Sequence, residues 1–133
     1  MNVIEIRKSV VDMILDHARR EAPNECCGLL LGTQSLIEQA RPARNVRLSP
    51  NRYLIDPADH FSAIREARAA GCQIIGVYHS HPNSAPNPSP TDLREATYRN
   101  YAYVIASPGW PNEVAGYRLV EMEFVAIELV IVN

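Results

Sequence analysis

Two closely spaced histidines, followed by a serine and an aspartate, are the residues of this chain best suited to chemistry. The run His-Ser-His-Pro-Asn-Ser-Ala-Pro-Asn-Pro-Ser-Pro-Thr-Asp begins at His79 and therefore contains His81, Ser89 and Asp92. Zn²⁺ binds imidazole nitrogen and carboxylate oxygen, and a catalytic zinc site uses three protein ligands and keeps a fourth position for water. The two histidines and Asp92 are therefore candidate metal ligands, and the upstream Glu25 is a candidate to activate the water. These residue types indicate a zinc hydrolase.

Each of these residues also has an ordinary structural explanation when it is taken alone. Paired histidines near a strand end are often simply exposed polar residues. The segment Ser89-Pro90-Thr91-Asp92 has the pattern of a helix-capping box with proline at the first helical position. Glu25 could be a solvated glutamate at the head of an apolar strand, as most glutamates are. These explanations remain compatible with a metal site, because a strand end and a helix start hold side chains more rigidly than a loop does.

Length and composition indicate one globular domain over residues 1–133. The chain has 133 residues, of which 47% are apolar and 21% are charged, and these are ordinary values for a protein with a buried core. The formal net charge of −2 gives no electrostatic reason to expect nucleic acid as a partner. We therefore expect a single domain with an ordinary hydrophobic core.

The sequence carries no pattern typical of export or membrane insertion. Acidic residues interrupt the apolar stretches near the N-terminus, and the longest apolar run, residues 124–132, is shorter than the roughly 20 residues that a spanning helix needs. Cys26, Cys27 and Cys72 are an odd number of cysteines without C-x-x-C spacing, which fits reduced thiols better than a disulfide framework. We therefore expect a cytoplasmic protein with no membrane contact.

The hydrophobic pattern predicts alternating short strands and helices. Apolar runs bounded by turn residues predict strands, while Ser9, Asp56-Pro57 and Ser89-Pro90 are helix-start signals and Gly71 is a natural stop. Strands are expected at residues 2–6, 25–31, 35–41, 73–78, 101–106, 113–120 and 123–132, with helices from Ser9 to about residue 20, from 57 to about 70, and from 90 onward. The order β-α-β-β-α-β-α-β-β-β predicts an α/β (α+β mixed) fold, a mixed β-sheet flanked by about three helices.

Strand geometry relates this order to the candidate site. Residues i and i+2 of a strand face the same side, so His79 and His81 at the end of the strand 73–78 can direct both rings into one pocket. The long apolar strand at the C-terminal end raises a separate possibility. If it lay at an exposed sheet edge, it would pair with a second copy and give a homodimer, although burial within one chain explains it equally well.

The full set of motifs resembles the JAMM (MPN+, Mov34/MPN/PAD-1) zinc metalloprotease family. The resemblance rests on Glu25, His79-x-His81-Pro and Ser89-x-x-Asp92 at their observed spacing. It extends to Pro-x-Glu-x-Cys-Gly around residue 25, to Arg-Tyr-Leu-Ile-Asp-Pro at residues 52–57 and to Gly-Val-Tyr before the histidines, so it covers nearly the whole chain. It implies a single-domain MPN/JAMM-like (cytidine-deaminase-like) fold.

The resemblance also implies a mechanism. His79, His81 and Asp92 would bind one Zn²⁺, whose effect is to lower the pKa of water from about 15.7 toward about 7. Glu25 would take a proton from the water and deliver it to the leaving amine, and Ser89 would donate a hydrogen bond to the developing oxyanion. Fe²⁺ or Co²⁺ in place of zinc stays open.

Family members cleave peptide or isopeptide bonds after the C-terminal Gly-Gly of ubiquitin or ubiquitin-like proteins. Only seven residues separate His81 from Ser89, and the chain lacks the insertions with which eukaryotic members hold ubiquitin. It is therefore similar to the compact stand-alone prokaryotic members, which process sulfur-carrier proteins of the ubiquitin fold. Whether the leaving group is an amino acid, a peptide or the lysine of a modified protein stays open.

Two alternative functions follow from the same residues. The first is a non-catalytic MPN-type interaction module, which the filled motif positions disfavour. The second is another zinc hydrolase such as a nucleoside deaminase. Deaminases use H-x-E with a downstream P-C-x-x-C, and neither motif occurs here.

Overall fold

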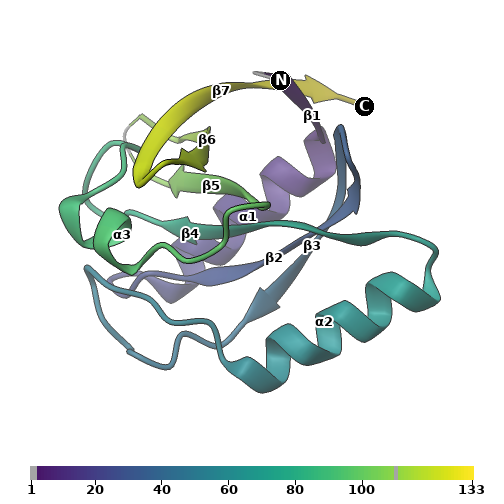
Figure 1. Cartoon of the computed structure of the whole chain (residues 1–133). Coiled ribbons are helices and arrows are strands. Elements are labelled where there is room, and N and C mark those ends of the chain that lie inside the picture. Colours follow the sequence, from purple (N-terminus) through teal and green to yellow (C-terminus); the bar gives the residue numbers. More distant parts are fainter. Residues whose placement is uncertain (1–2, 110) are drawn as a thin grey trace.

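The structure, a computed structural model, describes residues 3–109 and 111–133. Within these ranges the order of elements agrees with the predicted order (Figure 1). The elements are β1 (Val3–Arg7), α1 (Lys8–Glu21), β2 (Cys27–Thr33), β3 (Leu36–Ala43), α2 (Pro57–Ala69), β4 (Gln73–Ser80), α3 (Pro90–Glu95), β5 (Ala102–Ser107), β6 (Glu113–Val120) and β7 (Glu123–Val132). Asn2, which the sequence placed in the first strand, lies outside the described residues. None of the helices in the described ranges has the length and apolar character needed to span a bilayer.

The strands form one mixed sheet that closes on itself in the order β1-β3-β2-β4-β5-β6-β7. β4 and β5 are parallel, β2 lies antiparallel between β3 and β4, and β1 runs parallel to both β3 and β7. The mixed sheet is therefore confirmed, but its closure by β1 was not predicted. β7 pairs with β6 over residues 123–127 and with β1 over residues 128–132, so it closes the barrel and is not a free edge strand.

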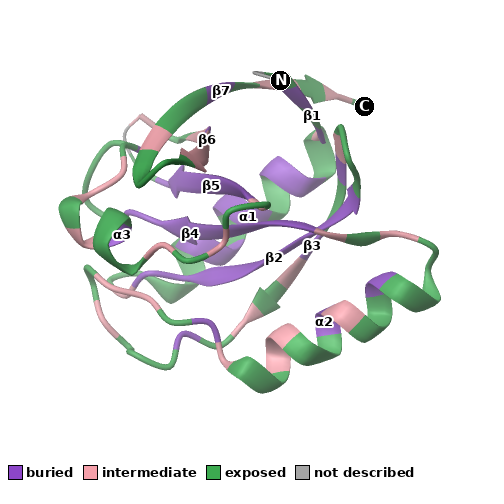
Figure 2. Ribbon diagram, in the orientation of Figure 1, coloured by how far each residue is buried: buried purple, intermediate pink, exposed green. Residues whose placement is uncertain are grey.

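Apolar side chains cover both faces of the central strands, and each face packs against its own helix. On β2, Leu30 joins the cluster that includes Ile14 of α1, whereas Leu29 and Leu31 join the cluster that includes Ala63 of α2. This alternation explains why β2 reads as a continuous apolar run, since a strand that is buried on both sides needs apolar residues at every position. Figure 2 shows β2, β4 and β5 buried and the outward surfaces of the helices exposed.

The helix starts show where local sequence signals were sufficient. Asp56 caps α2 by accepting a hydrogen bond from the backbone of Ala58, and Gly71 follows the helix with a φ of +75°, as glycine permits. The predicted cap at Ser9 is wrong. α1 begins at Lys8, directly after β1, and its N-cap Arg7 makes no capping hydrogen bond through its side chain. Packing of the apolar face of α1 into the barrel therefore fixes this start, rather than a cap.

Candidate active site

His79, His81 and Asp92 converge as the sequence predicted. One ligand atom from each residue lies within 4.8 Å of the other two, and all three residues are buried. The carboxylate oxygen Oδ2 of Asp92 lies 3.2 Å from Nε2 of His79 and 3.0 Å from Nε2 of His81. The three side chains therefore form a compact donor set with the chemistry of a divalent cation site.

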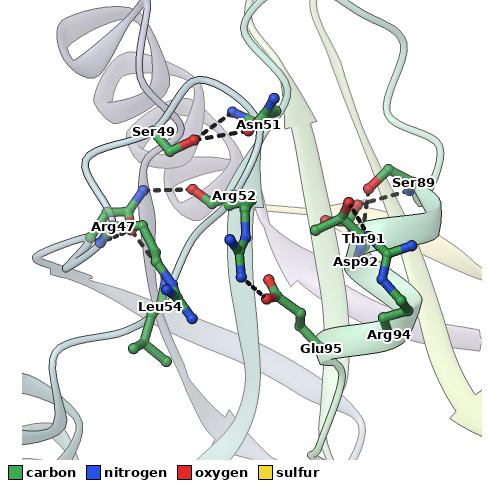
Figure 3. Close-up of polar contacts among 11 residues, drawn as sticks. Arg47, Ser49, Asn51, Arg52, Leu54, Ser89, Thr91, Asp92, Arg94 and Glu95 are labelled. Atoms are coloured by element: carbon green, nitrogen blue, oxygen red, sulfur yellow. Dashed lines mark hydrogen bonds and ion pairs between the residues drawn. The ribbon is translucent and has the colours of Figure 1, made fainter.

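Two elements place these ligands. His79 lies near the end of β4, opposite Cys27 of β2, and His81 follows the last residue of the strand. Asp92 lies in the first turn of α3, where a complete capping box with Ser89 fixes it (Figure 3). In that box the backbone N–H of Ser89 donates to Oδ2 of Asp92 at 2.9 Å. The segment 89–92 is thus both a helix cap and part of the candidate metal site, because the cap orients the carboxylate of Asp92.

The surroundings of His81 fit a cation. Its Nδ1 lies 3.0 Å from the carbonyl oxygen of Ala85, and since a carbonyl only accepts, this nitrogen carries a hydrogen. A neutral ring then presents a lone pair at Nε2, which faces the carboxylate of Asp92 at 3.0 Å. Two acceptors at this distance repel each other unless a proton or a metal ion lies between them. The same pairing raises the pKa of His81, although burial acts to lower it.

His79 gives a second, independent indication. Its side chain is 2% exposed, yet neither ring nitrogen makes a hydrogen bond to the described residues, although Nε2 lies 3.2 Å from the carboxylate of Asp92. Burial lowers the pKa of His79, so the ring is held neutral, with a lone pair free to bind a metal. The ring of Tyr53 stacks on it with centroids 4.3 Å apart and fixes its plane. A buried nitrogen without a partner is costly unless a ligand satisfies it.

The carboxylate of Asp92 stays ionised in this environment. Burial would raise the pKa of Asp92, but the neighbouring imidazoles of His79 and His81 and the N–H of Ser89 hold it well below its usual range. An ionised carboxylate beside two imidazole rings is a suitable ligand set for zinc.

Glu25 lies two residues before β2 and its side chain is buried, with Oε1 lacking a hydrogen-bond partner among the described residues. Burial raises the pKa of Glu25 to about 8, while the ring of His81 opposes this shift. Glu25, His81 and Ser89 line one small depression of about 160 Å³. A carboxyl group whose pKa lies near neutral pH can both accept and donate a proton at this position.

Ser89 is half-buried, and its oxygen accepts a hydrogen bond of 3.0 Å from the backbone N–H of Asp92. The hydroxyl hydrogen of Ser89 is thus free to donate toward the depression that it shares with Glu25. The structure therefore brings all five residues selected from the sequence to one place.

Several residues that support the site were missed from the sequence. Asn45 binds the backbone of Glu25, Ser80 accepts a hydrogen bond of 2.8 Å from the backbone N–H of Cys26, and Tyr53 stacks on His79. Of these three residues, only Tyr53 belongs to a motif recognised in the sequence, the Arg-Tyr-Leu-Ile-Asp-Pro segment of the family resemblance. Asn45 and Ser80 act through contacts that no local sequence pattern predicts.

Comparison with known proteins agrees with this geometry. Residues 7–126 match the family of prokaryotic homologs of the JAB domain. The chain belongs to this family. A solution structure from Desulfitobacterium hafniense, 28% identical to this JAB-domain chain, superimposes with a TM-score of 0.90 and covers 98% of this chain and 93% of its own.

Two further relatives with named activities align with most of this JAB-domain chain. The desampylase of Haloferax volcanii is 40% identical over 104 residues, which are 73% of this chain and 75% of the relative. The CysO-cysteine peptidase of Mycobacterium tuberculosis is 33% identical over 123 residues, which are 90% of this chain and 84% of the relative.

Proposed function

We propose that residues 1–133 form one catalytic domain, a zinc-dependent peptidase or isopeptidase. Its substrate is a ubiquitin-like or sulfur-carrier protein, which it cleaves after the C-terminal Gly-Gly. The observation that carries this proposal is the convergence of three buried ligand atoms within 4.8 Å, next to a depression lined by Glu25 and Ser89. A structural metal site would not need a buried carboxyl group without a partner beside it.

His79, His81 and Asp92 would hold one zinc ion per chain. When bound, zinc polarises a carbonyl group and acidifies water, so that a nucleophile is available near neutral pH. The carbonyl of Ala85 would keep the hydrogen of His81 on Nδ1 and leave its Nε2 available to a metal ion, and the stacked ring of Tyr53 fixes the plane of the His79 ring. These contacts set the ligand geometry before substrate arrives.

Glu25 acts as the general base and then as the general acid. Its carboxylate accepts a proton from the attacking water and passes it to the nitrogen of the leaving amine, which departs as the C–N bond breaks. Proton transfer of this kind contributes ~10²–10⁴-fold to a rate. The hydroxyl of Ser89 donates to the oxyanion, and loss of one such donor costs on the order of 10²–10³ in rate.

The substrate class is supported by both relatives and by the shape of the site. One relative is named a desampylase and the other a CysO-cysteine peptidase, and both align with most of this chain. A second depression of about 220 Å³ is lined by Asp92 together with, among others, Tyr53, Leu54 and Thr97. A chain end of two glycines suits small depressions such as these, because it has no side chains to clash.

Location and assembly belong to the same proposal. We place the enzyme in the cytoplasm, which the free thiols of Cys26, Cys27 and Cys72 support. The argument for a homodimer loses its basis, because β7 closes the barrel of its own chain.

The decisive experiment compares Glu25→Gln with His79→Ala on a carrier protein that ends in Gly-Gly plus one residue. We expect Glu25→Gln to keep one zinc per chain and lose most turnover, and His79→Ala to lose both. Cleavage by Glu25→Gln at a near wild-type rate would refute the role of Glu25. Cleavage that survives a strong chelator would refute the zinc mechanism, and full zinc content without any cleavage of such carriers would favour the interaction module.

A further inference from the structure

Asn45 is a buried side chain outside the motif, and all of its hydrogen-bonding capacity is used. Its Nδ2 donates to the carbonyl oxygens of Glu25 at 3.1 Å and Arg52 at 3.0 Å. Its Oδ1 accepts from the backbone N–H groups of Arg47 and Leu54, both at 3.0 Å. An amide has two donor hydrogens and two main acceptor positions, so these four bonds saturate it and fix its orientation.

These bonds connect the segment 45–54 to the backbone of Glu25. The carbonyl oxygen of Glu25 receives the bond from Asn45, and its N–H donates to the carbonyl oxygen of Ser49 at 2.8 Å. Glu25 precedes β2, so neither of these two groups lies in the strand ladder. The position of its carboxyl group along the site is therefore set by the segment 45–54 and not by the sheet alone.

The same segment also reaches the metal ligands. Tyr53 stacks on His79, and the guanidinium of Arg52 donates a hydrogen bond to the carboxylate of Glu95 on α3, the helix that carries Asp92. Figure 3 shows Arg52 reaching across to Glu95, with Ser49 and Asn51 bonded to each other further along the segment. One short segment thus contacts the acid–base group, one imidazole and the helix of the third ligand.

We propose that Asn45 is a positioning residue for the reaction, acting through Glu25, and this rests on the proposed function. Proton transfer requires Glu25 to lie within about 2.6–3.2 Å of the proton that it moves. A displacement of about 1 Å can cost on the order of 10²-fold in rate. Asn45 bonds the backbone of Glu25 directly and reaches His79 only through Tyr53, which lies between Arg52 and Leu54, so we expect its loss to act on the acid–base group while the metal stays bound.

The first test uses Asn45→Ala, with Asn45→Ser as a second variant in case the alanine protein does not fold. We expect kcat to fall about 10–100-fold while KM changes less than about threefold. Zinc content should stay at one per chain, and the absorption spectrum of the Co²⁺-substituted protein should match that of the wild type. Ser49→Ala is the matched control, because it removes a side-chain contact in the same segment but keeps the backbone bond to Glu25.

A double-mutant cycle with Glu25→Gln separates positioning from general damage. If Asn45 acts through Glu25, adding Asn45→Ala to Glu25→Gln lowers the single-turnover rate less than twofold further. A multiplicative loss, a changed Co²⁺ spectrum or loss of zinc would overturn the inference. A fully active Glu25→Gln enzyme would instead refute the proposed function, so the two failures are distinguishable.

Discussion

The hydrogen bond between His17 and Tyr78 offers a quantitative test of how the core supports the site. Nδ1 of His17 on α1 and the hydroxyl of Tyr78 on β4 lie 2.8 Å apart, and both residues are buried. Tyr78→Phe removes one partner and leaves the other unsatisfied away from water, which costs about 1–3 kcal/mol. We expect the free energy of unfolding at pH 8, measured by urea denaturation of the zinc-loaded protein, to fall by this amount.

Tyr101→Phe is the matched control. The hydroxyl of Tyr101 also pairs with a histidine, Nε2 of His60, but at 3.3 Å and in a partly exposed position. Water can replace this lost partner, so the control should lose less than about 1 kcal/mol. Equal losses in Tyr78→Phe and Tyr101→Phe would show that burial does not set the cost and would refute the reasoning.

The dependence on pH provides a second readout of the same pair. Burial lowers the pKa of His17, so the folded state binds a proton less readily than the unfolded chain. Its contribution to stability is therefore fully present above the unfolded pKa of about 6.5 and is lost as the pH falls, at up to about 1.4 kcal/mol per pH unit. His17→Asn removes the titration, so its stability relative to wild type should rise between pH 6.5 and 5. A constant difference would refute the assignment.

Two further perturbations test the packing around the site. Burial raises the pKa of Cys26 to about 11 and raises that of Cys27 further, whereas Cys72 is partly exposed. A thiol reagent at pH 8 should therefore react quickly with one cysteine in the native protein and with three in urea. Gly28→Ala should lower the free energy of unfolding by about 1–3 kcal/mol or prevent folding, measured by denaturation, because the added methyl would lie 2.4 Å from a backbone oxygen of β3 and from a ring carbon of β4.

The order of elements and the convergence of the candidate ligands could be predicted because local physical chemistry determines them. Strand alternation places His79 and His81 on one side, and the pattern Ser89-Pro90-Thr91-Asp92 both starts a helix and orients a carboxylate. Asp56-Pro57 starts α2 for the same local reason. Each of these signals extends over four residues or fewer, so it can be recognised from the sequence of this chain alone.

The closure of the barrel and the support of Glu25 depend on contacts between residues far apart in the chain. β1 pairs in parallel with β7, more than a hundred residues away, and no local pattern selects this partner over another strand. Asn45 lies twenty residues from Glu25, in a segment that reads only as an irregular connection. A polar residue in a loop is usually exposed. Asn45 is buried, and only the structure shows the four backbone groups to which its side chain bonds.

The candidate metal ligands and Glu25 are held in place in two different ways. His79 and Asp92 lie on regular structure, whose strand ladder and helix cap fix them within narrow limits, and His81 directly follows the same strand. Glu25 lies outside the ladder and depends on a loop, and in the proposed mechanism it is the one group that changes its protonation and its hydrogen-bond partner. A rigid frame suits atoms that hold an ion at a constant distance, and a loop joined by specific bonds suits a carboxyl group that transfers a proton between two reactants. Substitutions of the ligands held by the ladder and the helix cap are therefore expected to remove the metal, and loss of the Asn45 side chain to slow turnover while the metal stays bound.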